Sequence, residues 1–86
     1  MPLEEIRDYP KVIGSKQVKK AINRDEARKV FIAADAEPHI VEAIKKLCQA
    51  KEVEVEMVET MEKLGKYCGI DVGSATVALL KGPIGG

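Results

Sequence analysis

Hydrophobic and polar residues alternate in short blocks along the chain, and each block has the length of one helix or one strand. The continuous apolar run at 30–34 is typical of a strand that is covered on both faces, and residues 76–80 predict the last strand. Residues 11–13 predict another short strand, and the alternation over 53–58 predicts a strand with one face exposed for most of its length. The pattern therefore predicts about four strands.

Between these strands, apolar residues recur at the spacing of an amphipathic helix. Three ranges show this spacing: 15–24, 38–50 and 61–68. Ser15 and Thr60 are expected to cap the first and the third of these helices. The first helix is expected to stop at Asp25 in a left-handed conformation.

Helices and strands thus alternate along the chain with short connections, which predicts an α/β fold. The specific expectation is a three-layer α/β/α sandwich around a small mixed sheet of about four strands. Eighty-six residues leave room for one hydrophobic core, so a single domain over residues 1–86 is expected. Residues 3–8 predict one weak helical turn, and residues 82–86 are expected to form a loosely held tail.

The composition excludes several classes of protein. One Phe, two Tyr and no Trp disfavour nucleic-acid binding by stacking of bases on exposed rings. No apolar run approaches the roughly 18 residues of a membrane helix, and the acidic N-terminus lacks the features of a signal peptide. A cytoplasmic protein without membrane contact is therefore expected. Cys48, Cys68 and one histidine predict neither a metal site nor a disulfide framework.

Charge is distributed unevenly, although 14 basic and 14 acidic residues give a net charge of zero. Residues 11–29 hold seven basic and two acidic side chains, a net charge of +5. Residues 35–62 hold eight acidic and three basic side chains, a net charge of −5. An anionic partner at one end of the molecule and ordinary solvated faces both explain this asymmetry.

No set of residues predicts catalysis. Asp35 and Glu37 follow a buried strand, which is where open α/β sheets bind ligands, but no second acidic cluster accompanies them. No glycine-rich phosphate loop is present. Cys48 lies on an apolar helix face and is predicted to be a core residue, and His39 is predicted to be a surface residue without a partner. The sequence therefore predicts no catalytic residue and no cofactor.

The helix that follows Gly14 offers a different chemistry. Lys16, Gln17 and Lys20 share its first turn and a half, away from the apolar face. A helix N-terminus offers free N–H groups to phosphates, and lysine and glutamine side chains can bind base edges. A site for nucleic acid and an ordinary exposed helix face both fit these residues.

Three segments in this order carry a resemblance to a known family: Gly14–Ile22, Ile32–Pro38 and Leu64–Ile70. Most of the chain, from Lys11 to Lys81, resembles the ribosomal protein L-seven-Ae family of kink-turn RNA-binding proteins, and it looks closest to the small bacterial members. The resemblance implies an α/β/α sandwich without enzymatic activity. It also implies recognition of a kink-turn, which is a duplex sharply bent at a bulge that is followed by tandem sheared G·A pairs.

The resemblance implies two regions of RNA contact. The first is the helix that reads the G·A pairs, here Gly14, Ser15, Lys16, Gln17, Lys19 and Lys20. The second is an apolar pocket for a flipped-out bulge nucleotide, here Glu37, Val41, Met61, Ile70, Asp71, Val72 and Gly73. The implied partner is structured RNA, such as ribosomal RNA or a riboswitch, bound by a protein that is a monomer when free and is ribosome- or ribonucleoprotein-associated.

Four of these positions depart from the family's pattern. Lys16 and Gln17 stand where the usual pattern has Asn-Glu, and Met61 and Val72 stand where a basic residue is frequent. Two hypotheses follow. The chain is a kink-turn RNA-binding module, or it is a protein-interaction adaptor on the same fold that no longer binds RNA.

Overall fold

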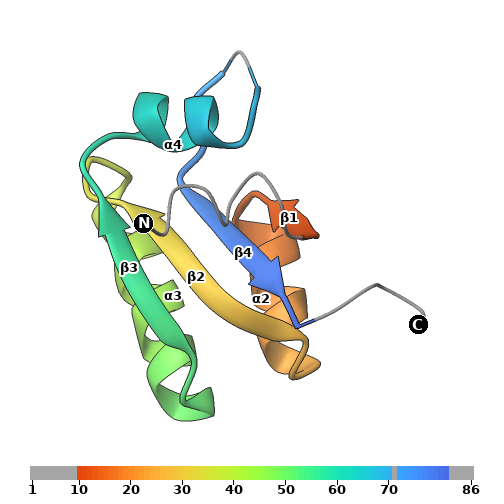
Figure 1. The fold of residues 1–86 in the computed structure, drawn as a ribbon. Coiled ribbons are helices and arrows are strands. Elements are labelled where there is room, and N and C mark those ends of the chain that lie inside the picture. The colour runs from red at the N-terminus through yellow and green to blue at the C-terminus, as the bar shows by residue number, and fades with distance from the viewer. Residues whose placement is uncertain (1–9, 71, 82–86) are drawn as a thin grey trace.

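The computed structural model describes residues 10–70 and 72–81, and its centre is a four-stranded sheet (Figure 1). The strands are β1 (Lys11–Ile13), β2 (Ala27–Ala33), β3 (Glu54–Val58) and β4 (Thr76–Leu80). They lie in the order β1-β4-β2-β3, so the last strand of the chain lies between the first two. Strand β4 is antiparallel to both of its neighbours, whereas β2 and β3 are parallel. The predicted small mixed sheet is confirmed.

Within residues 10–70 and 72–81, three helices cover this sheet: α2 (Ser15–Asn23), α3 (Pro38–Lys51) and α4 (Met61–Tyr67). Helices α2 and α3 lie behind the sheet in the view of Figure 1, and α4 lies at the end where β4 begins. The α/β fold is therefore confirmed. The turn predicted at 3–8 and the tail predicted at 82–86 lie outside the described residues.

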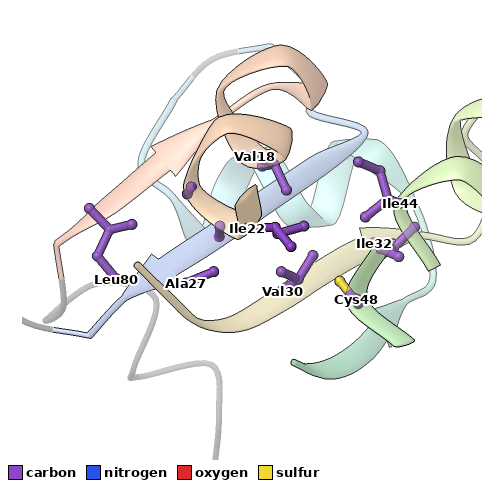
Figure 2. Close-up of a cluster of buried hydrophobic side chains, with 10 residues drawn as sticks. Val18, Ile22, Ala27, Val30, Ile32, Ile44, Cys48 and Leu80 are labelled. Atoms are coloured by element: carbon purple, nitrogen blue, oxygen red, sulfur yellow. The ribbon is translucent and has the colours of Figure 1, made fainter. Parts of the chain in front are cut away.

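The core beneath α2 and α3 explains the apolar stripes of both helices. Figure 2 shows its side chains pointing from the two helices and from β2 and β4 into one shared layer. Its buried members are Val18, Ala21, Ile22, Ala27, Val30, Ile32, Ile44, Cys48, Ala78 and Leu80. Cys48 is only 1% exposed, which confirms it as a core residue.

A second buried cluster occupies the opposite face of the sheet, under α4. Its members are Phe31, Ala33, Ala36, Val58, Leu64, Val77 and Leu79. Side chains alternate between the two faces along a strand, so a strand that is buried on both faces is apolar throughout. This explains the continuous apolar runs in β2 and β4.

Strand β2 begins at Ala27, three residues before the predicted start at Val30. The apolar run starts late because Arg28 and Lys29 are part of the strand. The ammonium of Lys29 lies 3.4 Å from a carboxylate oxygen of Glu54 and 3.0 Å from one of Glu56, so it is compensated by the neighbouring strand. The other predicted boundaries differ from the structure by one residue at most.

The expected cap at Ser15 is wrong. Gly14 is the N-cap of α2 and makes no side-chain cap, while Ser15 is the first helical residue. The Ser15 hydroxyl instead accepts a hydrogen bond from the Thr76 hydroxyl at 3.5 Å. The other two predictions hold: the Thr60 side chain accepts from the Lys63 N–H at 3.1 Å, and Asp25 has a φ of 59°.

Candidate nucleic-acid interface

Helices α2, α3 and α4 all begin at the same edge of the sheet, which we call the helix-start edge (Figure 1). The pairing of the strands explains this arrangement. Strands β2 and β3 are parallel, and β1 and β2 are both antiparallel to β4, so β1, β2 and β3 all end at that edge. Each is followed at once by a helix, and β4 begins there after the loop from α4.

The start of α2 is held against the start of β4. The Gly14 N–H donates to the Thr76 carbonyl oxygen at 3.0 Å, and the Gly14 carbonyl accepts from the Val18 N–H at 2.9 Å. Gly14 has a φ of 99°, which favours glycine over any residue with a side chain. The first turn of α2 is therefore fixed at the helix-start edge.

The outer side of α2 is basic. Lys16, Gln17, Lys19 and Lys20 are exposed, whereas the apolar side chains of the helix are buried. The helix contains no acidic residue. Within residues 10–70 and 72–81, none of its lysines forms an ion pair, whereas Lys29, Lys51 and Lys63 on other elements each do. These charges are therefore available to an anion.

A hollow of about 190 Å³ runs along α2 and contains a further basic residue. It is lined by Val12, Gln17, Lys20, Ala21, Arg24, Glu26 and Leu80. Arg24 follows Lys20 by four residues and therefore lies on the same side of the helix. Arg24 belongs to the basic segment 11–29 but was not among the predicted site residues, although its spacing from Lys20 is visible in the sequence.

Asp35 fixes the start of α4. Its Oδ1 atom accepts a hydrogen bond from the Met61 N–H at 2.8 Å, and the Met61 carbonyl in turn accepts from the Ser74 N–H at 3.1 Å. This carboxylate, which follows a buried strand and was therefore a candidate for ligand binding, thus ties the turn after β2 to α4. It positions the loop that precedes β4.

Two glycines let this loop pack closely on α4. A Cβ atom on Gly65 would collide with the carbonyl oxygen of Val72, and one on Gly73 would lie 3.1 Å from the Cβ of Met61. No contact of this kind is visible in the sequence, so the role of Gly65 was missed. Val72, Gly73 and Ser74 are therefore packed against α4 at the helix-start edge.

The residues predicted for the nucleotide pocket differ in exposure. The Val72 side chain is 70% exposed. Glu37 is exposed too, and its carboxylate oxygen lies 3.6 Å from Nδ1 of His39, with which it forms an ion pair only when His39 is protonated. Val41 and Met61 are partly buried and pack against the core. The remaining predicted residues are Ile70, which is partly buried, Gly73, which is exposed, and Asp71, which lies outside the described residues.

The described residues offer no catalytic or metal-binding set. No group of three or more metal-ligating side chains is found in 10–70 and 72–81, and no helix there is long and apolar enough to cross a membrane. Burial raises the pKa of the Cys48 thiol to about 11 and also raises that of Cys68. Neither thiol is therefore activated as a nucleophile at neutral pH.

Residues 6–82 match the Ribosomal protein L7Ae/L30e/S12e/Gadd45 family, and the chain belongs to that family. The chain is 50% identical over 70 residues to RNA-binding protein BH0128 of Halalkalibacterium halodurans, an alignment that covers 81% of this chain and 85% of the relative. It is 41% identical over 80 residues to large ribosomal subunit protein eL8 of Halobacterium salinarum, an alignment that covers 91% of this chain and 67% of that relative. The predicted family is thus confirmed.

Solved structures agree with this assignment. The 15.5kD RNA binding protein of Giardia lamblia superposes with a TM-score of 0.79 at 29% identity, over 86% of this chain and 62% of that protein. A protein of unknown function from Bacillus halodurans superposes with a TM-score of 0.75 at 22% identity, over 80% of this chain and 69% of that protein. This similarity supports the fold alone.

Proposed function

We propose that this protein binds structured RNA at the helix-start edge, without catalysing a reaction, and that its target is a kink-turn. One observation carries the proposal. The start of α2 and the loop before β4 are held at the same edge, by the Gly14–Thr76 and Met61–Ser74 hydrogen bonds. Relatives of this chain carry the name RNA-binding protein. The described positions for which the family resemblance implies RNA contact belong to the starts of α2, α3 and α4 or to the loop before β4, which supports the proposal.

The first contact is made by α2. Its free N–H groups and partial positive charge stabilise phosphates at the helix start. Lys16, Gln17 and Lys20 bind base edges of the G·A pairs, with Ser15 and Lys19 beside them. Arg24 extends this basic side along the helix. Relative to the Asn-Glu pattern, Lys16 adds a positive charge and Gln17 removes a negative one, which favours binding to a polyanion.

The second contact is made by the loop before β4 and the starts of α3 and α4. The exposed Val72 side chain gives an extruded bulge nucleotide an apolar surface, and the Glu37 carboxylate accepts hydrogen bonds from its base. Val41 and Met61 form the inner wall, and Ile70, Asp71 and Gly73 complete the loop. Because Met61 and Val72 carry no charge, this pocket binds the base rather than the phosphate.

The mechanism is a shift of population. A free kink-turn exchanges between an extended and a bent form, and a protein that touches both the G·A pairs and the bulge binds only the bent form. RNA shape and a few base edges then provide specificity, so aromatic side chains are not needed. We further propose that the protein is cytoplasmic and is a monomer when free. Its target RNA belongs to the ribosome or to another ribonucleoprotein.

The test is calorimetric titration of a kink-turn hairpin, with the same RNA carrying Watson–Crick pairs in place of its two G·A pairs as the control. Tight binding that the control RNA abolishes is expected. Equal, salt-sensitive binding of both RNAs would contradict kink-turn recognition and indicate a nonspecific basic surface. Binding of neither RNA would favour the adaptor hypothesis, for which the zero net charge is the supporting observation.

A further inference from the structure

A second hollow lies on the other side of β1 from the hollow along α2. Its volume is about 210 Å³, and it is lined by Lys11, Lys66, Tyr67, Cys68 and Gly69. Lys11 belongs to β1, whereas Lys66 and Tyr67 end α4 and Cys68 and Gly69 follow it. Successive side chains of a strand point to opposite faces, so Lys11 faces this hollow while Val12 faces the one at α2.

The described lining of this hollow contains two ammonium groups and no carboxylate. Neither Lys11 nor Lys66 forms an ion pair within the described parts of the chain, in contrast to Lys29, Lys51 and Lys63. Two cations from separate elements that line one depression, neither of them in an ion pair with a described residue, create a positive potential there. Such a potential favours an anionic group.

The Cys68 thiol shares this hollow with Lys11. Burial raises the pKa of the thiol, and the positive charge of Lys11 opposes that rise. Cys68 is partly buried, so it is also a potential probe of whether the hollow is occupied.

Short chain connections lead from the residues of this hollow to both proposed RNA contacts. Gly69 is followed by Ile70, the first residue of the loop before β4, whose N–H donates to the Gly65 carbonyl at 3.1 Å. At its other end, β1 leads directly to Gly14 and the start of α2. An RNA bound at the helix-start edge can extend over either face of β1. On the face away from α2, its backbone passes next to this hollow.

We propose that Lys11 and Lys66 bind a backbone phosphate of the second arm of the bent RNA, the arm that does not lie along α2. This inference rests on the proposed function. A kink-turn has two arms that diverge from the bend, and the hollows on the two faces of β1 are placed to hold one arm each. The α2 side reads bases, and the Lys11 side binds the phosphodiester backbone.

The test is a Lys11→Gln/Lys66→Gln double variant, compared with Lys45→Gln/Lys46→Gln, which makes the same charge change at exposed positions of α3. Binding is measured across salt concentrations with the full kink-turn hairpin and with two hairpins, each shortened in one arm. About tenfold weaker binding of the full hairpin is expected. The plot of log affinity against log salt should become shallower by about one, as for one lost phosphate contact.

Shortening one particular arm should remove the difference between parent and double variant, and shortening the other arm should leave it intact. The preference for the kink-turn over the control RNA with Watson–Crick pairs should persist. A double variant that binds like the parent, or an equal loss in the α3 variant, would overturn the inference while leaving the proposed function standing. A parent that does not prefer the kink-turn would overturn both.

Alkylation of Cys68 by iodoacetamide gives a second, independent measurement. Saturating amounts of the full hairpin should slow the reaction several-fold, and the hairpin lacking the second arm should not. Cys48 is 1% exposed and should stay unreacted in the folded protein. Unchanged Cys68 reactivity in the saturated complex would place the second arm elsewhere and overturn the inference.

Discussion

The carboxylate of Asp35 accepts a hydrogen bond at 2.8 Å from the backbone N–H of Met61, 26 residues further along the chain. The Thr60 side chain accepts from the Lys63 N–H at 3.1 Å. Two N–H groups that the helix itself leaves without a partner are thus satisfied by side chains. Because Met61 also binds Ser74, a carboxylate at the end of β2 determines where the loop before β4 lies.

Replacing Asp35 by alanine should therefore lower the free energy of unfolding by about 1–2 kcal/mol, as for a lost helix cap with a charged acceptor. It should also weaken RNA binding, because the loop before β4 loses its support. Asp35→Asn keeps an acceptor oxygen and should lose less. Urea denaturation measures both variants, and an alanine variant as stable as the parent would show that the hydrogen bond has no structural role.

Alanine at Gly65 should destabilise the protein even though alanine favours helices. At an ordinary helical position the change would stabilise by up to about 1 kcal/mol. Here the added Cβ collides with the Val72 carbonyl oxygen, so the loop must move, at a cost of about 1–3 kcal/mol. The exposed Glu62→Ala on the same helix is the control and should change stability by less than about 0.5 kcal/mol. A stabilised Gly65→Ala would contradict the close packing of loop and helix.

Glycine at Glu52 should stabilise the protein. Glu52 ends α3 with a φ of 58°, a left-handed conformation that residues with a side chain adopt at a cost. Its side chain is exposed, and relief of the strain should raise the free energy of unfolding by about 0.5–1 kcal/mol after the entropy cost of glycine. Asp25→Gly should raise the free energy of unfolding by less, because this change also removes the ion pair of Asp25 with Lys51 at 3.2 Å. Thermal unfolding of both variants and the parent measures these changes, and a Glu52→Gly variant that is less stable than the parent would contradict the strain at Glu52.

Serine at Cys48 should reduce stability and leave the RNA affinity of the folded protein unchanged. A hydroxyl buried in the layer between α2, α3 and the sheet lacks a partner, at a cost of about 1–3 kcal/mol. Cys48→Ala leaves no polar group and should lose less than the serine variant. A serine variant that is stable but no longer binds RNA would contradict the assignment of Cys48 to the core.

The same thiol predicts a dependence of stability on pH. Burial raises the pKa of Cys48 from 9.0 to about 11, so the thiol ionises more readily in the unfolded chain than in the folded one. Its contribution to stability is complete below pH 9.0 and is lost as the pH rises toward about 11. The parent should therefore lose stability more steeply than Cys48→Ala over this interval. If the free energy of unfolding falls equally steeply with pH in the parent and in Cys48→Ala, Cys48 makes no such contribution.

Alanine at Lys20 should weaken binding to a kink-turn by about 1–3 kcal/mol, as for one lost base-edge contact. Lys45→Ala removes the same charge from α3 and should change the affinity little. Calorimetry with the folded variants measures both. An unchanged affinity for Lys20→Ala would remove this residue from the interface, and a large loss for Lys45→Ala would mean that RNA binds on another face.

Several parts of the fold could be predicted because their signals are local. The apolar runs of β2 and β4 and the stripes of α2 and α3 depend on periodicity within one element. Thr60 and Asp25 were identified from the chemistry of single residues at helix ends. Ser15 was assigned wrongly because a cap requires a particular backbone geometry, and at this position Gly14 supplies the turn while Ser15 enters the helix.

The candidate site was predictable only in its first half. Lys16, Gln17 and Lys20 share a helix face, so their grouping follows from spacing alone. The support given by Asp35 and Gly65 was missed, because each acts on a residue brought close by the fold. The position of Arg24, four residues after Lys20 on the same helix side, could also have been predicted from spacing alone.

By itself, the sequence determined the order of the elements, the sides that each buries and the membership of a family, since these properties are recorded in short periodic patterns and segments. The tertiary structure decided that three helices begin at one edge and that β4 lies between β1 and β2. It thereby brought Lys11 and Lys66 to one hollow and Asp35 to the start of α4. Such contacts depend on strand order and direction, which long-range packing selects and which no spacing along the chain encodes.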